Sequence, residues 1–89
     1  MVTWELRFTK NAEKDAKSLK KANLDKKAQE ILNRIKVDPY IIPPPFEKLR
    51  ADLNGKYSRR INIQHRIVYS IMPDDKEIIV YAMYSHYGE

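Results

Sequence analysis

Residues 66–84, Arg66-Ile-Val-Tyr-Ser-Ile-Met-Pro-Asp-Asp-Lys-Glu-Ile-Ile-Val-Tyr-Ala-Met-Tyr84, decide the fold. β-Branched and aromatic residues fill both Arg66–Ile71 and Ile78–Tyr84, and such residues are typical of strands. Met72–Lys76 contains the proline and aspartates of a turn. The second run is apolar almost throughout, which indicates a strand in a central position in its sheet. The stretch therefore predicts two strands separated by a turn.

The segment before this stretch predicts a third strand and a stiff connector. Tyr57–Ile63 follows the turn signal Asn54-Gly55, and we expect it to form a hairpin with Arg66–Ile71. The four prolines of Pro39–Pro45 offer no backbone donor, so this segment can neither continue a helix nor lie in a central strand. A polyproline recognition motif is the alternative, which we disfavour inside so small a domain.

The N-terminal half predicts a strand followed by two helices. Thr3–Thr9 alternates polar and apolar residues, as a half-buried strand does. A first apolar helix stripe begins near Asn11, with Thr9 or Asn11 as its cap, and a second and stronger stripe ends at Asp38-Pro39. The stripes consist of Ala12, Ala16 and Leu19, and of Leu24, Ala28, Ile31, Leu32 and Ile35. The order predicts an α+β fold with a helical hairpin on one face of an antiparallel sheet.

Length and composition restrict the class of protein. We expect residues 1–89 to form one domain with a shallow surface groove, because a chain of 89 residues has no material for a second core. The formal charge of +5, from 17 basic and 12 acidic residues, favours encounters with polyanions. No signal peptide is recognisable, and no apolar run approaches the roughly 20 residues that cross a bilayer. With no cysteine in the chain, we expect a cytoplasmic protein that makes no membrane contact.

Two classes of site are poorly supported by composition. The only histidines, His65 and His86, are far apart in sequence and no cysteine accompanies them, so we expect no metal site. Gly55 and Gly88 are the only glycines, which excludes a glycine-rich phosphate loop.

Seven polar residues remain that could serve one site on or beside the sheet. They are Glu47, Arg50, Arg59, Arg60, Arg66, His86 and Tyr87. RNA cleavage at the 2′-hydroxyl needs such a set, because a base takes the hydroxyl proton, cations stabilise the charge added at phosphorus, and an acid protonates the departing 5′-oxygen. This reaction requires no metal or cofactor. Taken alone, however, the residues support only a basic α+β domain with a nucleic-acid surface.

Each candidate also has an ordinary structural interpretation. Glu47, with basic neighbours, is typical of a surface ion pair, and a histidine near a C-terminus, such as His86, is usually just exposed. Adjacent strand positions point to opposite faces, so we expect only one of Arg59 and Arg60 to line a given site. His65 in the hairpin bend is expected to be structural.

An ordered set of short motifs in the C-terminal half resembles one known family. The motifs are Phe46-Glu47-Lys48-Leu49-Arg50, Leu53-Asn54-Gly55, Tyr57-Ser58-Arg59-Arg60-Ile61, His65-Arg66-Ile67-Val68-Tyr69 and Ser85-His86-Tyr87. Together they resemble the YoeB (Txe) branch of the RelE/ParE toxin superfamily, and the N-terminal half agrees with that branch in the order and length of its elements. The resemblance implies a RelE-like fold and the toxin of a type II toxin-antitoxin system.

The same resemblance implies an activity and partners. It implies a ribosome-dependent mRNA endonuclease that acts in the decoding site of the small subunit and is inhibited by a YefM-like antitoxin. Glu47 matches the family's general base, His86 its general acid, and Arg66 the arginine at the phosphate. A homodimer is also suggested.

Further residues match substrate-binding positions of the family. Arg60 matches the second arginine of the Ser-Arg-Arg run, with Arg59 as the alternative, and Tyr87 matches the terminal aromatic residue. Arg50 stands where the family often has lysine, so the positive charge is retained. Relatives often stop close to the tyrosine, whereas here Gly88-Glu89 follows, and the added carboxylate is expected to weaken RNA binding slightly.

Two other classes of function share the expected fold or charge. A ParE-like toxin binds gyrase and does not cut RNA, and such an inhibitor needs neither the carboxylate of Glu47 nor the imidazole of His86. A basic nucleic-acid-binding domain without catalysis would make phosphate contacts alone, and its affinity would fall steeply with salt.

Overall fold

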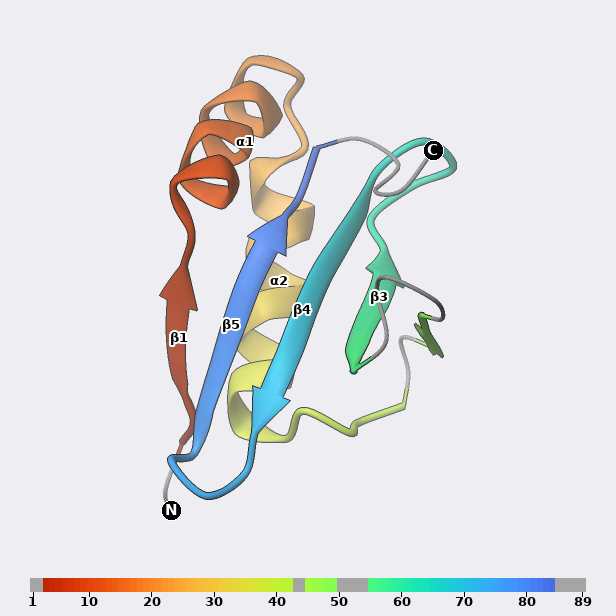
Figure 1. Cartoon of the computed structure of the whole chain (residues 1–89). Helices are drawn as coiled ribbons and strands as arrows, with labels where there is room; N and C mark the ends of the chain where they lie inside the picture. The colour runs from red at the N-terminus through yellow and green to blue at the C-terminus, as the bar shows by residue number, and fades with distance from the viewer. Residues whose placement is uncertain (1–2, 43–44, 50–54, 85–89) are drawn as a thin grey trace.

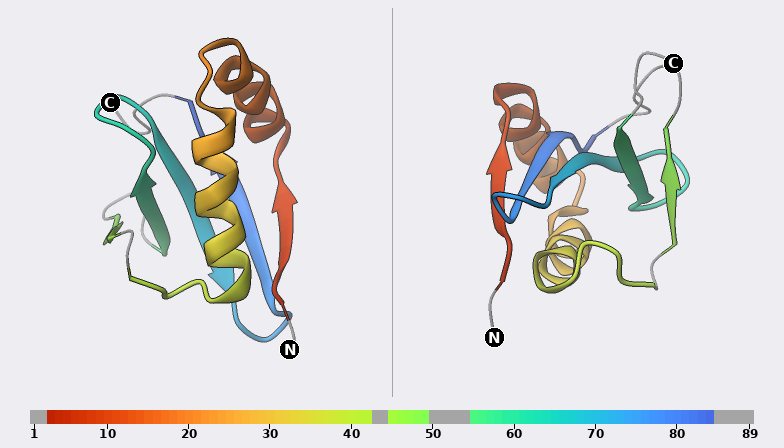
Figure 2. Two further views of the ribbon diagram at one scale, coloured as in Figure 1. Left: turned by 180° about the vertical axis from the view of Figure 1, so that it is seen from behind. Right: turned by 60° about the horizontal axis from the view of Figure 1, so that its bottom comes forward.

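The computed structural model describes residues 3–42, 45–49 and 55–84, in which a five-stranded sheet is covered on one face by two helices (Figure 1, Figure 2). The elements are β1 (Glu5–Phe8), α1 (Lys10–Lys21), α2 (Asp25–Val37), β2 (Phe46–Lys48), β3 (Lys56–Arg60), β4 (Arg66–Met72) and β5 (Glu77–Ala82). The strand order is β1-β5-β4-β3-β2. The predicted α+β arrangement, with a helical hairpin on one face, is confirmed.

The helices begin and end where the local sequence requires. Of the two candidate caps, Thr9 is the N-cap of α1, because its hydroxyl accepts a hydrogen bond of 3.1 Å from the amide of Ala12. Helix α2 ends at Val37, where Asp38 adopts an extended backbone in front of Pro39. Neither of these described helices is long and apolar enough to cross a membrane.

The sheet is mixed, which differs from the expectation of a purely antiparallel sheet. β1 pairs with β5 in parallel, and Leu6 lies opposite Ile78, whereas the other neighbouring strands are antiparallel. In the sequence, the two helices lie between β1 and the other four strands. These four strands alternate in direction from β2 to β5, and β5 runs in the same direction as β1. An alternating apolar pattern shows which face of a strand is buried but not the direction in which the strand pairs. The predicted interior position of Ile78–Tyr84 is confirmed, since β5 lies between β1 and β4.

β2 is a strand that was not predicted from the sequence. It comprises only Phe46–Lys48, directly after the proline connector, and it pairs antiparallel with β3 at one edge of the sheet. Three residues are too few for an alternating pattern to be recognised. This short edge strand is nevertheless the element that carries Glu47.

The core lies between the helices and the covered face of the sheet. Its buried residues are Ala12, Leu19, Ala28, Ile31, Leu32 and Ile35 from the helices, and Ile61, Ile67, Tyr69, Ile78, Val80 and Met83 from the sheet and its ends. Because strand side chains alternate, Ile67 and Tyr69 face the helices while Arg66 and Ser70 face the other side. We call this other side the open face.

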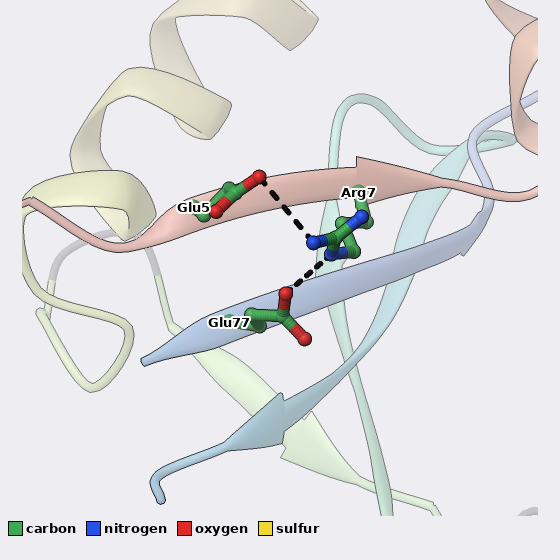
Figure 3. Close-up of polar contacts among 3 residues, drawn as sticks. All are labelled: Glu5, Arg7 and Glu77. Atoms are coloured by element: carbon green, nitrogen blue, oxygen red, sulfur yellow. Dashed lines mark hydrogen bonds and ion pairs between the residues drawn. The ribbon is translucent and has the colours of Figure 1, made fainter. Parts of the chain in front are cut away.

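The free edge at β1 carries charged side chains on the open face (Figure 3). The guanidinium of Arg7 pairs with the carboxylates of Glu77 and Glu5, the second at 3.6 Å. The hydrogen bond and charge of Glu77, followed by the charge of Glu5, raise the pKa of Arg7 above its ordinary value. Exposed charges at a strand edge discourage pairing with another chain, so this edge is protected from association.

Candidate active site

A cavity of about 300 Å³ opens between β2, β3 and β4 on the open face. Pro45, Glu47, Ser58, Arg60 and Arg66 line it. Strand register explains how these residues meet, because Glu47 lies opposite Ser58 in one strand pair and Arg60 lies opposite Arg66 in the next. Residues directly opposite each other in antiparallel strands point to the same face. The register therefore brings one carboxylate and two guanidinium groups to one cavity.

Glu47 and Arg66 form the closest charged pair of this cavity. Glu47 Oε2 lies 3.6 Å from Arg66 Nη1, and the side chains are 67% and 23% exposed, respectively. An ion pair that is so open to water contributes only about 0–1 kcal/mol to stability. The ordinary interpretation of Glu47 as an ion-pair partner is thus correct, with Arg66 as the partner. The contact also leaves the carboxylate accessible from the cavity.

Arg66 has a further nitrogen that the described residues leave unused. Its Nε is buried and has no hydrogen-bond partner among residues 3–42, 45–49 and 55–84. A guanidinium presents its donors in a planar fork that matches the oxygen atoms of a phosphate. Arg60 is exposed on the neighbouring strand and adds a second guanidinium to the same cavity. The guanidinium groups of Arg60 and Arg66 are together well suited to binding an oligoanion.

The structure separates the two adjacent arginines of β3. Arg60 lines the cavity, whereas Arg59 faces the core and is 0% exposed. Arg59 Nε donates to the Tyr69 hydroxyl at 2.8 Å, and its Nη1 and Nη2 donate to the carbonyls of Ile41 and Pro39 at 2.7 and 2.9 Å. Its donors are therefore directed into the protein, and the contacts of Arg59 with the connector resolve the choice that the sequence leaves open.

His65 lies in the bend between β3 and β4 and has the local role expected of it. The Asn62 side chain accepts hydrogen bonds from the amides of Gln64 and His65, at 2.9 and 2.8 Å, and so shapes the bend. The imidazole of His65 stacks on Tyr84, with ring centroids 4.5 Å apart. Tyr84, which follows β5, is thereby held beside the residue that precedes Arg66.

Three predicted site residues, Arg50, His86 and Tyr87, lie outside the described residues. Their roles remain predictions. Conversely, Ser58 and Pro45 line the cavity although sequence reasoning did not select them. Ser58 could have been found, because it stands two positions before Arg60 and must share its face. Pro45 follows only from the position of β2.

Comparisons with known proteins agree on one family. The family model described as "YoeB-like toxin of bacterial type II toxin-antitoxin system" matches residues 8–87. The toxin YoeB of Synechocystis sp. is 37% identical over 73 residues, which cover 82% of this chain and 76% of that protein.

Solved structures show the same relationship. YoeB of Staphylococcus aureus is 33% identical in its complex with YefM and 32% identical as a dimer; each has a TM-score of 0.79 and covers 94% of this chain and 98% of its own. A YoeB/ParE toxin from Agrobacterium tumefaciens has a TM-score of 0.84 at 26% identity, covering 93% and 99%. The expected RelE-like fold is therefore confirmed, and the chain belongs to the YoeB-like toxins of bacterial type II toxin-antitoxin systems, within the RelE/ParE superfamily.

Proposed function

We propose that this toxin is an endoribonuclease that cuts mRNA on the ribosome through a 2′-hydroxyl. The observation that carries the proposal is the Glu47 carboxylate, 3.6 Å from the Arg66 guanidinium in an open cavity that Arg60 also lines. A proton acceptor beside two phosphate-binding cations is the combination that this reaction requires.

In the proposed reaction, Glu47 removes the proton from a 2′-hydroxyl. The 2′-oxygen bonds to the adjacent phosphorus, the bond from phosphorus to the 5′-oxygen breaks, and a 2′,3′-cyclic phosphate remains on the upstream fragment. Arg66 and Arg60 stabilise the charge on the phosphoryl oxygens, and His86 protonates the departing 5′-oxygen.

The openness of the site explains why the ribosome would be needed. A carboxylate is a weak base for a hydroxyl, so the rate depends on holding the 2′-oxygen in line with the breaking bond. Glu47 is 67% exposed on a short edge strand, and a free RNA would rarely adopt the required geometry against such a surface. We propose that the decoding site of the small subunit supplies it.

The proposed protein partner is a YefM-like antitoxin, acting in the cytoplasm. The S. aureus relative has been solved in complex with YefM and also as a dimer. An acidic antitoxin segment that covers Arg60 and Arg66 would compete with the RNA phosphate for the same donors. A homodimer is proposed on the same relationship.

His86→Gln is expected to lower cleavage on programmed ribosomes by about 100-fold, because the 5′-oxygen then departs without a proton. The test is a substrate in which sulfur replaces that 5′-oxygen. A thiolate leaves without protonation, so His86→Gln should cut the sulfur substrate at nearly the wild-type rate. A defect that persists with sulfur would exclude His86 as the general acid.

The proposed function itself is tested by incubating the toxin with mRNA in the presence and absence of programmed ribosomes. We expect cleavage only with ribosomes. Equal cleavage of free mRNA would contradict ribosome dependence. Intact mRNA in both reactions, together with inhibition of gyrase, would instead support the ParE-like alternative.

A further inference from the structure

The buried Arg59 is a charged group that the proposed reaction does not use. It is 0% exposed, and it donates hydrogen bonds to the Tyr69 hydroxyl and to the carbonyls of Pro39 and Ile41. Burying a cation is costly unless its donors are satisfied, and an apolar side chain of similar volume is often at least as stable. Overall stability alone therefore does not account for an arginine at this position.

Tyr69 serves Arg59 as a neutral acceptor. Burial raises the pKa of the Tyr69 hydroxyl, and this effect exceeds the opposing effect of the hydrogen bond from Arg59. The phenol thus stays protonated under physiological conditions, and its oxygen offers a dipole in a fixed direction. The Tyr69 hydroxyl and the Pro39 and Ile41 carbonyls are neutral acceptors whose positions are set by the sheet or by the connector. Such hydrogen bonds fix the position of the connector relative to the sheet.

Arg59 contacts the proline connector near its start and β2 at its end. The Pro39 and Ile41 carbonyls belong to the segment that leaves α2. At the other end, Phe46 lies opposite Arg59 in the strand pairing, and the guanidinium carbon lies 4.9 Å from the centre of the Phe46 ring. Phe46 also packs edge-on against Tyr57, with centroids 5.6 Å apart. One buried side chain therefore joins the start of the connector and β2 to the core.

The position of β2 depends on these contacts more than that of a central strand would. β2 has only three residues and lies at the edge of the sheet, where β3 is its one partner among the described strands. Glu47 follows Phe46 directly and points to the open face. A shift of β2 would move the Glu47 carboxylate away from Arg66, and a misplacement of about 1 Å can cost about 100-fold in rate.

We infer that Arg59 is a positioning residue that, together with Tyr69, fixes the connector and β2 and so holds the Glu47 carboxylate in place beside Arg66. This inference rests on the proposed function, because it explains how the proposed base is held. Arg59 acts from the core and does not touch RNA.

The experiment compares two tyrosine-to-phenylalanine variants that each lose one hydroxyl. Tyr69→Phe removes the acceptor of Arg59. The matched control, Tyr81→Phe, removes a hydrogen bond of 3.0 Å to Ser70 between β4 and β5, away from the connector. Arg59→Met and Arg59→Lys extend the series, and Tyr69→Phe keeps the test open if Arg59→Met does not fold. Each variant is assayed on programmed ribosomes for kcat and KM, and its amide hydrogen exchange is followed at residues 46–49.

Tyr69→Phe is expected to lower kcat about 10-fold with KM unchanged, and Arg59→Met about 100-fold, with Arg59→Lys between them. Exchange at residues 46–49 should be faster in these variants while β4 and β5 stay protected. Tyr81→Phe should leave kcat and this exchange as in the wild type. Equal loss of kcat in Tyr69→Phe and Tyr81→Phe, or normal exchange at residues 46–49 in Tyr69→Phe, would overturn the inference.

The exchange measurement separates this inference from the proposed function. If the wild-type protein does not cut mRNA on ribosomes, the proposed function fails. Faster exchange at residues 46–49 in Tyr69→Phe but not in Tyr81→Phe would still support the anchoring of β2 by Arg59, and normal exchange would overturn it.

Discussion

Glu47→Gln is expected to lower the cleavage rate on programmed ribosomes by about 1000-fold, because the amide cannot accept the proton of the 2′-hydroxyl. Glutamine keeps the size of the side chain and can still hydrogen-bond to Arg66, so the cavity and the position of β2 should be preserved. The measurement is a single-turnover cleavage rate at saturating toxin, together with the affinity for the programmed ribosome. We expect the affinity to stay within a few-fold of the wild type.

Glu5→Gln is the matched control for this variant. Glu5 is also an exposed carboxylate on a strand, and it too lies 3.6 Å from an arginine, Arg7 (Figure 3). It lies on β1 at the opposite edge of the sheet. Wild-type rates are expected for Glu5→Gln. If Glu47→Gln cleaved as fast as Glu5→Gln, then Glu47 could not be the base.

Arg66→Met is expected to lower the single-turnover rate by about 100- to 1000-fold, because the charge that develops on the phosphoryl oxygens loses its nearest donor. Arg66 lines the open cavity beside Glu47, so its guanidinium is placed to donate to a phosphate bound there. Arg66→Lys should recover only part of the rate, since an ammonium group is a point charge and cannot form the planar fork. Both variants are measured by the single-turnover assay used for Glu47.

The control for Arg66 is Arg7→Met, which removes an arginine that also faces the open side and also pairs with glutamates. It should cleave mRNA like the wild type. If these arginines acted only through overall positive charge, both variants would bind the programmed ribosome more weakly and to the same extent. The size of this loss would depend on the salt concentration. Equal effects of Arg66→Met and Arg7→Met would therefore assign Arg66 to general electrostatic attraction and remove it from the site.

Much of this fold is predictable because the segments with the clearest apolar patterns are also the segments that pack in the core. The apolar stripe that ends before Pro39 becomes α2, and the apolar run from Ile78 becomes an interior strand. The parallel pairing of β1 with β5 was not predictable, because both strands would show the same residue pattern in either direction. β2 was missed for a different reason, since its three residues form a strand only through contact with β3 and the core.

The candidate site was predictable as a set of residues but not as a geometry. The resemblance selected Glu47 and Arg66. The contact between their side chains, however, depends on the register of β2, β3 and β4, and β2 was not predicted from the sequence. Alternation required Arg59 and Arg60 to face opposite sides, but only the packing of the connector shows which one is buried. Arg50, His86 and Tyr87 lie outside the described residues, so their roles still rest on the resemblance.

The 2′-hydroxyl is the atom on which the proposed chemistry depends, and it can be removed from the substrate without changing the protein. The measurement uses ribosomes programmed with an mRNA in which the nucleotide upstream of the cleaved bond is 2′-deoxy and every other nucleotide is unchanged. We predict that the toxin binds this complex as tightly as the all-ribose complex but leaves that bond intact, and that the all-ribose mRNA yields a 2′,3′-cyclic phosphate. Cleavage of the 2′-deoxy mRNA at that bond would contradict the account, because Glu47 would then have no hydroxyl from which to remove a proton.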